Sequence, residues 1–200
     1  IQTSLDLLAD EDDAKQQVRL RAIAMRGIQK LESTLGKVTE AASLEEALRD
    51  EGVFAFDASK VVRDAVDASS RSYPTIYWNL EVPEIQLIIS GNDFRFEQLL
   101  DKLIDNAIAF VNDNGWIKVE LIDGITTAAL IVENSGTPIA ERTAQTAFQI
   151  FSGTRNDSTG SHLGLGLYVV RLIAESMKAV PTIENTADGV RVMVSGFRVM

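Results

Sequence analysis

The sequence predicts an α+β domain with helices on one face of a mixed β-sheet, preceded by an α-helical hairpin. The 200 residues are 46% hydrophobic and 24% charged, which is typical of a folded chain with one sizeable core. Apolar residues recur at helical spacing in residues 1–50, whereas β-rich and helical segments alternate in residues 51–200. The helices are too many for a β-sandwich. We therefore assign residues 1–50 to the hairpin and residues 51–200 to the domain.

The first two predicted elements form the hairpin. Ile1–Ala9 is apolar and helical in character, and an acidic turn follows in which Asp13 and Gln16 fit a capping box. One short helix cannot cover the long helix that comes next, so we expect a second copy to do so, giving a homodimer. Packing of the long helix on its own domain is the alternative. The apolar stripe of the long helix consists of residues three to five positions apart: Leu20, Ile23, Ile28, Leu31, Leu35, Val38 and Ala42.

The elements of the domain follow from local patterns of capping, alternation and turn residues. Two of the β-rich segments, Thr75–Val82 and Ile85–Ser90, are joined by a turn at a Pro-Glu pair, which predicts that neighbouring strands pair with each other. The other predicted elements are a strand at Val53–Phe56, a helix capped by Asp57 and ending near Ser70, a helix at Phe94–Val111 capped by Asn92 or Asp93, strands at Trp116–Leu121 and Thr127–Glu133, a short helix within Ala140–Phe151, a mobile loop at Ser152–Ser161, a helix at Gly164–Met177, and strands at Thr182–Glu184 and Val190–Met200.

The composition excludes several classes of function. The absence of cysteine and the single histidine rule out disulfides, thiolate zinc sites and multi-histidine metal sites. The net charge of −10 argues against broad electrostatic binding to nucleic acid or to an anionic membrane surface. The longest unbroken apolar runs, such as Ala128–Val132, are too short to cross a membrane. Because the chain starts at Ile1 without a signal-peptide pattern, we expect a fragment of a longer protein.

The segment Leu99–Phe110, LLDKLIDNAIAF, places Asn106 among apolar residues of a helix that face a core: Leu99, Leu100, Leu103, Ile104, Ala107 and Ile108. Lys102 and Phe110 lie one turn away on either side, on the same face. A buried amide must find hydrogen bonds or pay a desolvation cost of about a few kcal/mol. Asn106 is therefore either bonded to a neighbouring loop or a metal ligand whose amide oxygen faces a cleft.

Two glycine-containing segments are further candidates for ligand binding. In VENSGTPI, Asn134 ends an apolar strand and Gly136 permits a close backbone approach, although an ordinary turn would look the same. In SHLGLGLYVV, Gly164 and Gly166 open a helix after a polar loop. Glycines at such a place let phosphate oxygens reach backbone N–H groups, and the helix dipole favours the anion. The alternative is a glycine pair that permits tight packing of helix on sheet.

The order and spacing of these segments resemble the ATP-binding domain of sensor histidine kinases, in the wider fold shared with gyrase, ninety-kilodalton heat-shock proteins and mismatch-repair ATPases. LLDKLIDNAIAF resembles the N box, VENSGTPI the first glycine box, AFQIF the F box and HLGLGLYVVRLIAE the last glycine box. The likeness covers about Ala55 to Met200, and the hairpin resembles the tail of a dimerisation and phosphotransfer domain. The last box resembles that of a proteobacterial subgroup associated with sortase systems.

The resemblance implies ATP and Mg²⁺ as cofactors. It assigns Asn106 to Mg²⁺, the backbone of the last glycine box to the phosphates, and residues 152–162 to a lid over bound nucleotide. His162 then either contacts phosphate or is simply exposed. The implied nucleotide-binding residues are Asn106, Phe110, Asn134, Gly136, Ile139, His162, Gly164, Leu165 and Gly166, and the candidate phosphate contacts are Lys102 and Arg155.

The chain departs from the family pattern in four ways. Lys102 stands where the N box has a second Asn, and Pro138 replaces the second glycine of its box. Asn134 replaces the Asp that reads adenine, which removes the charge assistance of that hydrogen bond. The histidine that accepts the phosphoryl group is absent and is expected upstream of Ile1.

We therefore expect the cytoplasmic catalytic portion of an ATP-dependent protein-histidine kinase. The full-length protein would lie in the bacterial inner membrane through a missing upstream segment. It would transfer the γ-phosphoryl group of ATP to its own histidine and onward to an aspartate of a response-regulator receiver domain. This fragment should not autophosphorylate. The alternatives are a degenerate nucleotide-binding or nucleotide-free signalling module, and another ATPase or serine kinase of the same fold.

Overall fold

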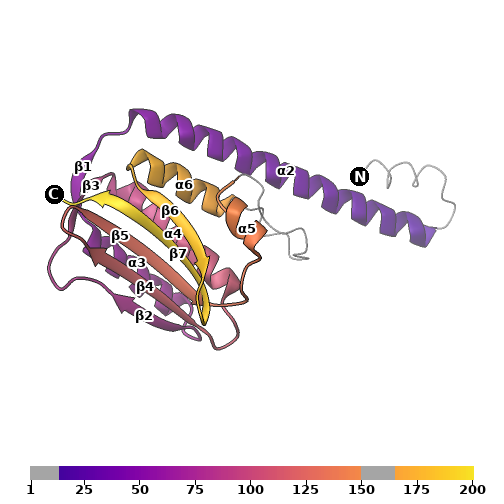
Figure 1. Cartoon of the computed structure of the whole chain (residues 1–200). Coiled ribbons are helices and arrows are strands. Elements are labelled where there is room, and N and C mark those ends of the chain that lie inside the picture. The colour runs from indigo at the N-terminus through magenta and orange to yellow at the C-terminus, as the bar shows by residue number, and fades with distance from the viewer. Residues whose placement is uncertain (1–13, 150–164) are drawn as a thin grey trace.

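The computed structural model consists of one long helix and a domain in which helices cover a β-sheet (Figure 1). It describes residues 14–149 and 165–200. The elements in chain order are α2 (Ala14–Asp50), β1 (Phe54–Asp57), α3 (Ala58–Ser72), β2 (Tyr77–Glu81), β3 (Ile88–Gly91), α4 (Asp93–Phe110), β4 (Trp116–Asp123), β5 (Thr127–Ser135), α5 (Glu141–Thr146), α6 (Gly166–Ser176), β6 (Val180–Asn185) and β7 (Gly189–Arg198).

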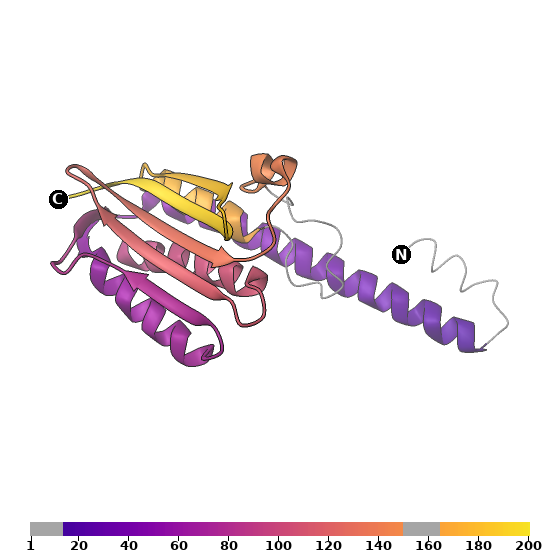
Figure 2. The same ribbon diagram turned by 60° about the horizontal axis from the view of Figure 1, so that its bottom comes forward.

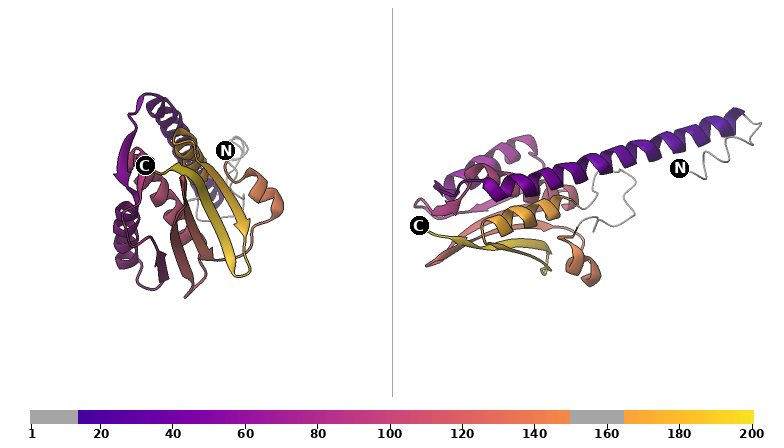
Figure 3. Two further views of the ribbon diagram at one scale, coloured as in Figure 1. Left: turned by 60° about the vertical axis from the view of Figure 1, so that its left-hand side comes forward. Right: turned by 90° about the horizontal axis from the view of Figure 1, so that it is seen from above.

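The main sheet is mixed, as predicted. Its five strands have the order β2-β4-β5-β7-β6; β2 runs parallel to β4 and the other neighbours are antiparallel. Helices α3, α4 and α6 lie on one face of this sheet, which Figure 3 shows edge-on in its right-hand view. The α+β class with helices on one face is therefore confirmed.

The pairing of the strands after α3 differs from the prediction. β2 and β3 do not form a hairpin, because β2 pairs with β4 and β3 pairs with β1 in a separate two-stranded sheet. The connection between β2 and β3 instead runs along the start of α3. There Arg63 donates to the carbonyl of Pro83 over 2.6 Å, and Ala58 N–H donates to the carbonyl of Leu87 over 2.9 Å. Because these bonds hold the connection against α3, β3 lies away from β2.

Helix α4 is the centre of the core. Five of the residues that the spacing predicted to face the core are buried against the sheet and α6, namely Leu99, Leu100, Leu103, Ile104 and Ala107. The sixth, Ile108, is partly buried, and Phe96 is buried as well. The ring of Phe96 lies 5.4 Å from that of Phe56 and 5.2 Å from that of Phe197. The predicted caps are confirmed, since Asp57 accepts from Lys60 N–H at the start of α3 and Asn92 accepts from Arg95 N–H at the start of α4.

A row of side chains with alternating charge crosses the outer face of the sheet and fixes its register. Glu133 on β5 accepts a hydrogen bond of 2.9 Å from Nε of Arg191 on β7, and Nη2 of the same guanidinium lies 2.9 Å from the same carboxylate oxygen. Arg191 also contacts Glu184 on β6, and Lys118 on β4 pairs in register with Glu133. Successive residues of a strand face opposite sides, so this row holds the next residue, Asn134, on the face covered by helices.

The long helix α2 has 37 residues and projects well beyond the domain (Figure 2). Its apolar stripe is largely exposed, with Leu31 62% and Leu35 69% accessible. Within the described residues no helix is long and apolar enough to cross a membrane. The predicted first helix of the hairpin, Ile1–Ala9, lies outside the described residues.

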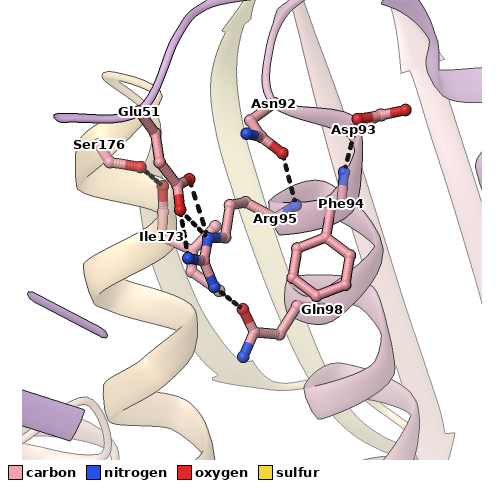
Figure 4. Close-up of polar contacts among 8 residues, drawn as sticks. All are labelled: Glu51, Asn92, Asp93, Phe94, Arg95, Gln98, Ile173 and Ser176. Carbon is pink, nitrogen blue, oxygen red and sulfur yellow. Dashed lines mark hydrogen bonds and ion pairs between the residues drawn. The ribbon is translucent and has the colours of Figure 1, made fainter. Parts of the chain in front are cut away.

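The C-terminal end of α2 is attached to the domain by apolar packing and an ion pair. Leu44 is buried in the core cluster and Leu48 packs against it. Just after the helix, the carboxylate of Glu51 accepts from the guanidinium of Arg95, whose Nε lies 2.8 Å and 2.9 Å from the two oxygens. Figure 4 shows this pair beside the end of α6, with Arg95 also bonded to Gln98. Residues 44 positions apart are thereby joined.

We predict that this ion pair stabilises the attachment of α2 measurably. In a double-mutant cycle of Glu51→Gln and Arg95→Met, the coupling free energy of unfolding should be about 1–3 kcal/mol, because the bonds are charge-assisted and half-buried. Urea denaturation of the four proteins measures it. The exposed pair of Lys60 and Asp64 on α3 is the matched control and should give no resolvable coupling. Equal results for the two cycles would contradict the prediction.

The same pair predicts a pH dependence. The hydrogen bond from Arg95 holds the pKa of Glu51 below its ordinary value of 4.5. A depressed pKa in the folded state means that the stabilisation is complete above about pH 4.5 and is lost as the pH falls through the lowered pKa. The coupling measured in the cycle should therefore disappear in acid.

Candidate nucleotide-binding site

The C-terminal half of α4 carries the first candidate residues. Asn106 is half-buried, and its side chain makes no hydrogen bond within the part of the chain that the structure describes. Lys102 lies one turn earlier and its Nζ is 4.0 Å from the carboxylate of Asp105. Phe110 ends the helix with 48% of its surface exposed. Among the described residues, therefore, Asn106 does not bond a neighbouring loop, which was the alternative that the sequence left open.

The end of β5 carries the second set. Asn134 is only 4% exposed and pairs with Ile117 and Val190 on the neighbouring strands. Its side-chain Nδ2 is buried and has no hydrogen-bond partner among the described residues. A buried donor without an acceptor costs about 1–3 kcal/mol. An acceptor supplied by a ligand would remove that cost.

Gly136 brings these two sets together. A Cβ at this position would lie 2.6 Å from the backbone oxygen of Phe110 and 2.7 Å from Nδ2 of Asn134. Only glycine therefore permits the turn after β5 to lie against the end of α4. The predicted N box and first glycine box are adjacent in space.

The start of α6 carries the third set. Leu165 is buried and occupies the N-cap, where it makes no side-chain capping bond. The first N–H groups of the helix therefore lack the capping oxygen that Ser, Thr or Asp would supply. A Cβ on Gly166 would meet no atom of the described residues within 4 Å. Tight packing of helix on sheet does not explain this glycine.

One residue at the rim of the site was not predicted from the sequence. Asn185, at the end of β6, accepts from the N–H of Ile139 over 2.8 Å and donates to the carbonyl of the same residue over 2.9 Å. Ile139 itself is half-buried, three residues after Gly136. The position of Asn185 at a strand end, next to the Asp-Gly turn, could have been noticed in the sequence. Its contact with Ile139, 46 residues away, could not.

Several predicted site residues lie outside the described residues: Arg155, His162 and Gly164, together with the loop 152–161 and Phe151. Their predicted roles stay predictions. No group of three or more acidic or histidine side chains in the described ranges could hold a metal ion. A cation bound here would need oxygens from a second ligand, which is how Mg²⁺ is held with nucleotide phosphates.

The model of the histidine kinase-, DNA gyrase B- and HSP90-like ATPase family matches residues 91–198, which include all three sets. The chain belongs to this ATPase family. It is 28% identical to the sensor protein ChvG of Rhizobium meliloti (strain 1021) over 204 positions, covering 96% of this chain and 34% of that protein. It is 26% identical to ChvG of Agrobacterium fabrum (strain C58 / ATCC 33970), covering 95% and 33%. The chain spans about a third of the length of these relatives.

Solved structures agree with the assignment to this ATPase family. The catalytic domain of histidine kinase ThkA is 26% identical, with a TM-score of 0.65 over 74% of this chain and 97% of that one. The Acinetobacter baumannii histidine kinase AdeS is 20% identical, and its TM-score of 0.65 over 98% of this chain shows that the fold is shared over nearly the whole length. The chain is therefore a histidine kinase ATP-binding domain with a preceding helix. The likeness to the sortase-associated subgroup stays a prediction.

We predict opposite responses to alanine at two glycines of the ATPase domain. At Gly189 a Cβ would lie 1.9 Å from the backbone oxygen of Asn134, and backbone cannot yield as a side chain can. Gly189→Ala should therefore lower the free energy of unfolding by about 1–3 kcal/mol. Gly166→Ala should leave it unchanged or raise it by up to about 1 kcal/mol, since alanine favours helix. Urea denaturation measures both, and a strongly destabilised Gly166→Ala protein would contradict this account of α6.

Proposed function

We propose that this domain binds Mg²⁺-ATP and that the full-length kinase transfers the γ-phosphoryl group to a histidine outside the given sequence, and from there to an aspartate of a response regulator. The observation that carries the proposal is Gly166: it opens α6 beside an uncapped set of N–H groups, in space that no described residue fills. Backbone N–H groups at such a helix start bind phosphate oxygens. The backbone of Leu165 and Gly166, with Gly164, would hold the phosphates.

Asn106 fits the role of the metal ligand. Its amide, which has no partner among the described residues, offers one neutral oxygen, and Mg²⁺ typically takes one or two protein oxygens and completes its shell with phosphates and water. Mg²⁺ would neutralise the charge that develops on the transferred group. Lys102 stands one turn away and its ammonium can add to that neutralisation. The protein's own contribution is to position the triphosphate, since phosphoryl transfer needs little covalent help.

Asn134 fits contact with the base. It faces the helical side of the sheet, beside Gly136 and the end of α4, where Phe110 and Ile139 would flank a purine. Its amide oxygen can accept from the adenine amine without the charge assistance of a carboxylate. The unpartnered Nδ2 is also the specific observation that favours a second candidate, a degenerate module that signals without nucleotide.

The partners follow from the helix and the family. The exposed stripe of α2 suits a second copy of the chain, giving a homodimer. A structure of ThkA is described as a complex with the response regulator protein TrrA, and its TM-score to this chain is 0.67. By analogy a receiver domain is the phosphoryl acceptor of this kinase. We place the full-length protein in the bacterial inner membrane and this portion in the cytoplasm.

Calorimetric titration with ATP, with and without Mg²⁺, tests the proposal. Wild type should bind, and Asn106→Ala should lose most of the Mg²⁺-dependent gain, about tenfold in affinity or 1.4 kcal/mol. Gly166→Ala should bind more weakly although its fold is intact. Lack of nucleotide binding by wild type would favour the degenerate module. Unchanged binding by Asn106→Ala would remove the metal assignment.

We predict that the α2 stripe mediates self-association. Leu31→Glu or Leu35→Glu places a charge in the apolar interface and should shift the protein from dimer to monomer, because a buried unpaired charge is costly. Light scattering at several concentrations measures the mass. Gln29→Glu on the exposed polar side of α2 is the matched control and should remain dimeric. A wild-type protein that is monomeric at high micromolar concentration would count against the dimer.

A further inference from the structure

The segment between β5 and α5 is held by a side chain from another part of the chain. Asn185 bonds both the N–H and the carbonyl of Ile139, at 2.8 Å and 2.9 Å, which reproduces the pairing of one strand residue with another. Each bond is exposed and on its own contributes modestly to stability. Together they fix the position of one backbone unit in two directions.

The path of the chain explains why a clamp is needed there. After β5 ends at Ser135, the segment crosses the start of β7 to reach the end of β6. The last two residues of β5 lie so close to Gly189 that a Cβ there would meet Ser135 Cα at 3.1 Å as well as the backbone of Asn134. A bond of 2.9 Å from Thr186 N–H to the carbonyl of Gly189 closes the turn between β6 and β7. Residues 185–189 therefore contact the end of β5 at Gly189 and hold the segment that follows β5 through Asn185.

We propose that Asn185 is a positioning residue for the nucleotide, acting through Ile139. This inference rests on the proposed nucleotide function of the site. The clamp holds Ile139 and the preceding turn at Gly136 in place before the base arrives. Without it the segment must be ordered at the moment of binding, and that ordering lowers affinity. The effect belongs to the base end of the site and not to the phosphate end at α6.

The test is calorimetric titration of the full chain with Mg²⁺-ATP and, separately, with Mg²⁺-ADP. Asn185→Ala should lose about tenfold in affinity for both nucleotides alike, with little change in Tm, since the lost bonds are exposed. Asn185→Gln keeps both the donor and the acceptor and should recover much of the affinity. Asn79→Ala, which removes an exposed asparagine from the distant β2, is the matched control and should bind as wild type does.

Three results would overturn the inference. If Asn185→Ala binds nucleotide as tightly as wild type does, the inference is refuted. A loss for ATP that clearly exceeds the loss for ADP would place the effect at the phosphates. A large fall in Tm that Asn185→Gln fails to reverse would make the residue merely structural. If wild type binds neither nucleotide, the proposed function itself fails, and this inference fails with it; that outcome differs from a wild type that binds and a variant that binds equally.

Discussion

The close approach of the end of α4 to the turn after β5 is the constraint on which the site depends. Gly136 lies where any side chain would collide with the backbone of Phe110. This contact holds the face of α4 that carries Asn106 next to the last buried residues of β5. The apolar face of α4 fixes the rotation of that helix, and the ion pairs across the outer face of the sheet fix which way Asn134 points.

The described part of the domain leaves several polar groups without partners, where a purely structural protein would cap them or pair them with hydrogen bonds. Among the described residues, Nδ2 of Asn134 has no acceptor and the side chain of Asn106 has no partner, and the N-cap of α6 is a leucine. Each is a small cost in the free protein. The three groups lie in three boxes of one ATPase family, and the turn at Gly136 brings two of these boxes together. A ligand rich in acceptors and anionic oxygens would offset their cost.

The sequence predicted most of this because its signals are local. The helical period of α4, the caps Asp57 and Asn92, and the residues of each of the four boxes can be recognised within short stretches of the sequence. What it missed depends on contacts between distant residues. The pairing of β2 with β4 instead of β3, the bond between Arg95 and Glu51, and the clamp of Asn185 on Ile139 join residues that no local pattern connects. Exposed polar side chains such as Asn185 also look alike until a partner is known.

Amide NMR of the labelled chain titrated with Mg²⁺-ATP tests the central claim most directly, because it reports each residue separately. The account predicts shifts at the side-chain amides of Asn106 and Asn134 and at the backbone of Gly136 and Gly166. Signals from the outer face of the sheet, such as the indole N–H of Trp116, should stay where they are. Shifts confined to that outer face, with the four site residues unmoved, would contradict it.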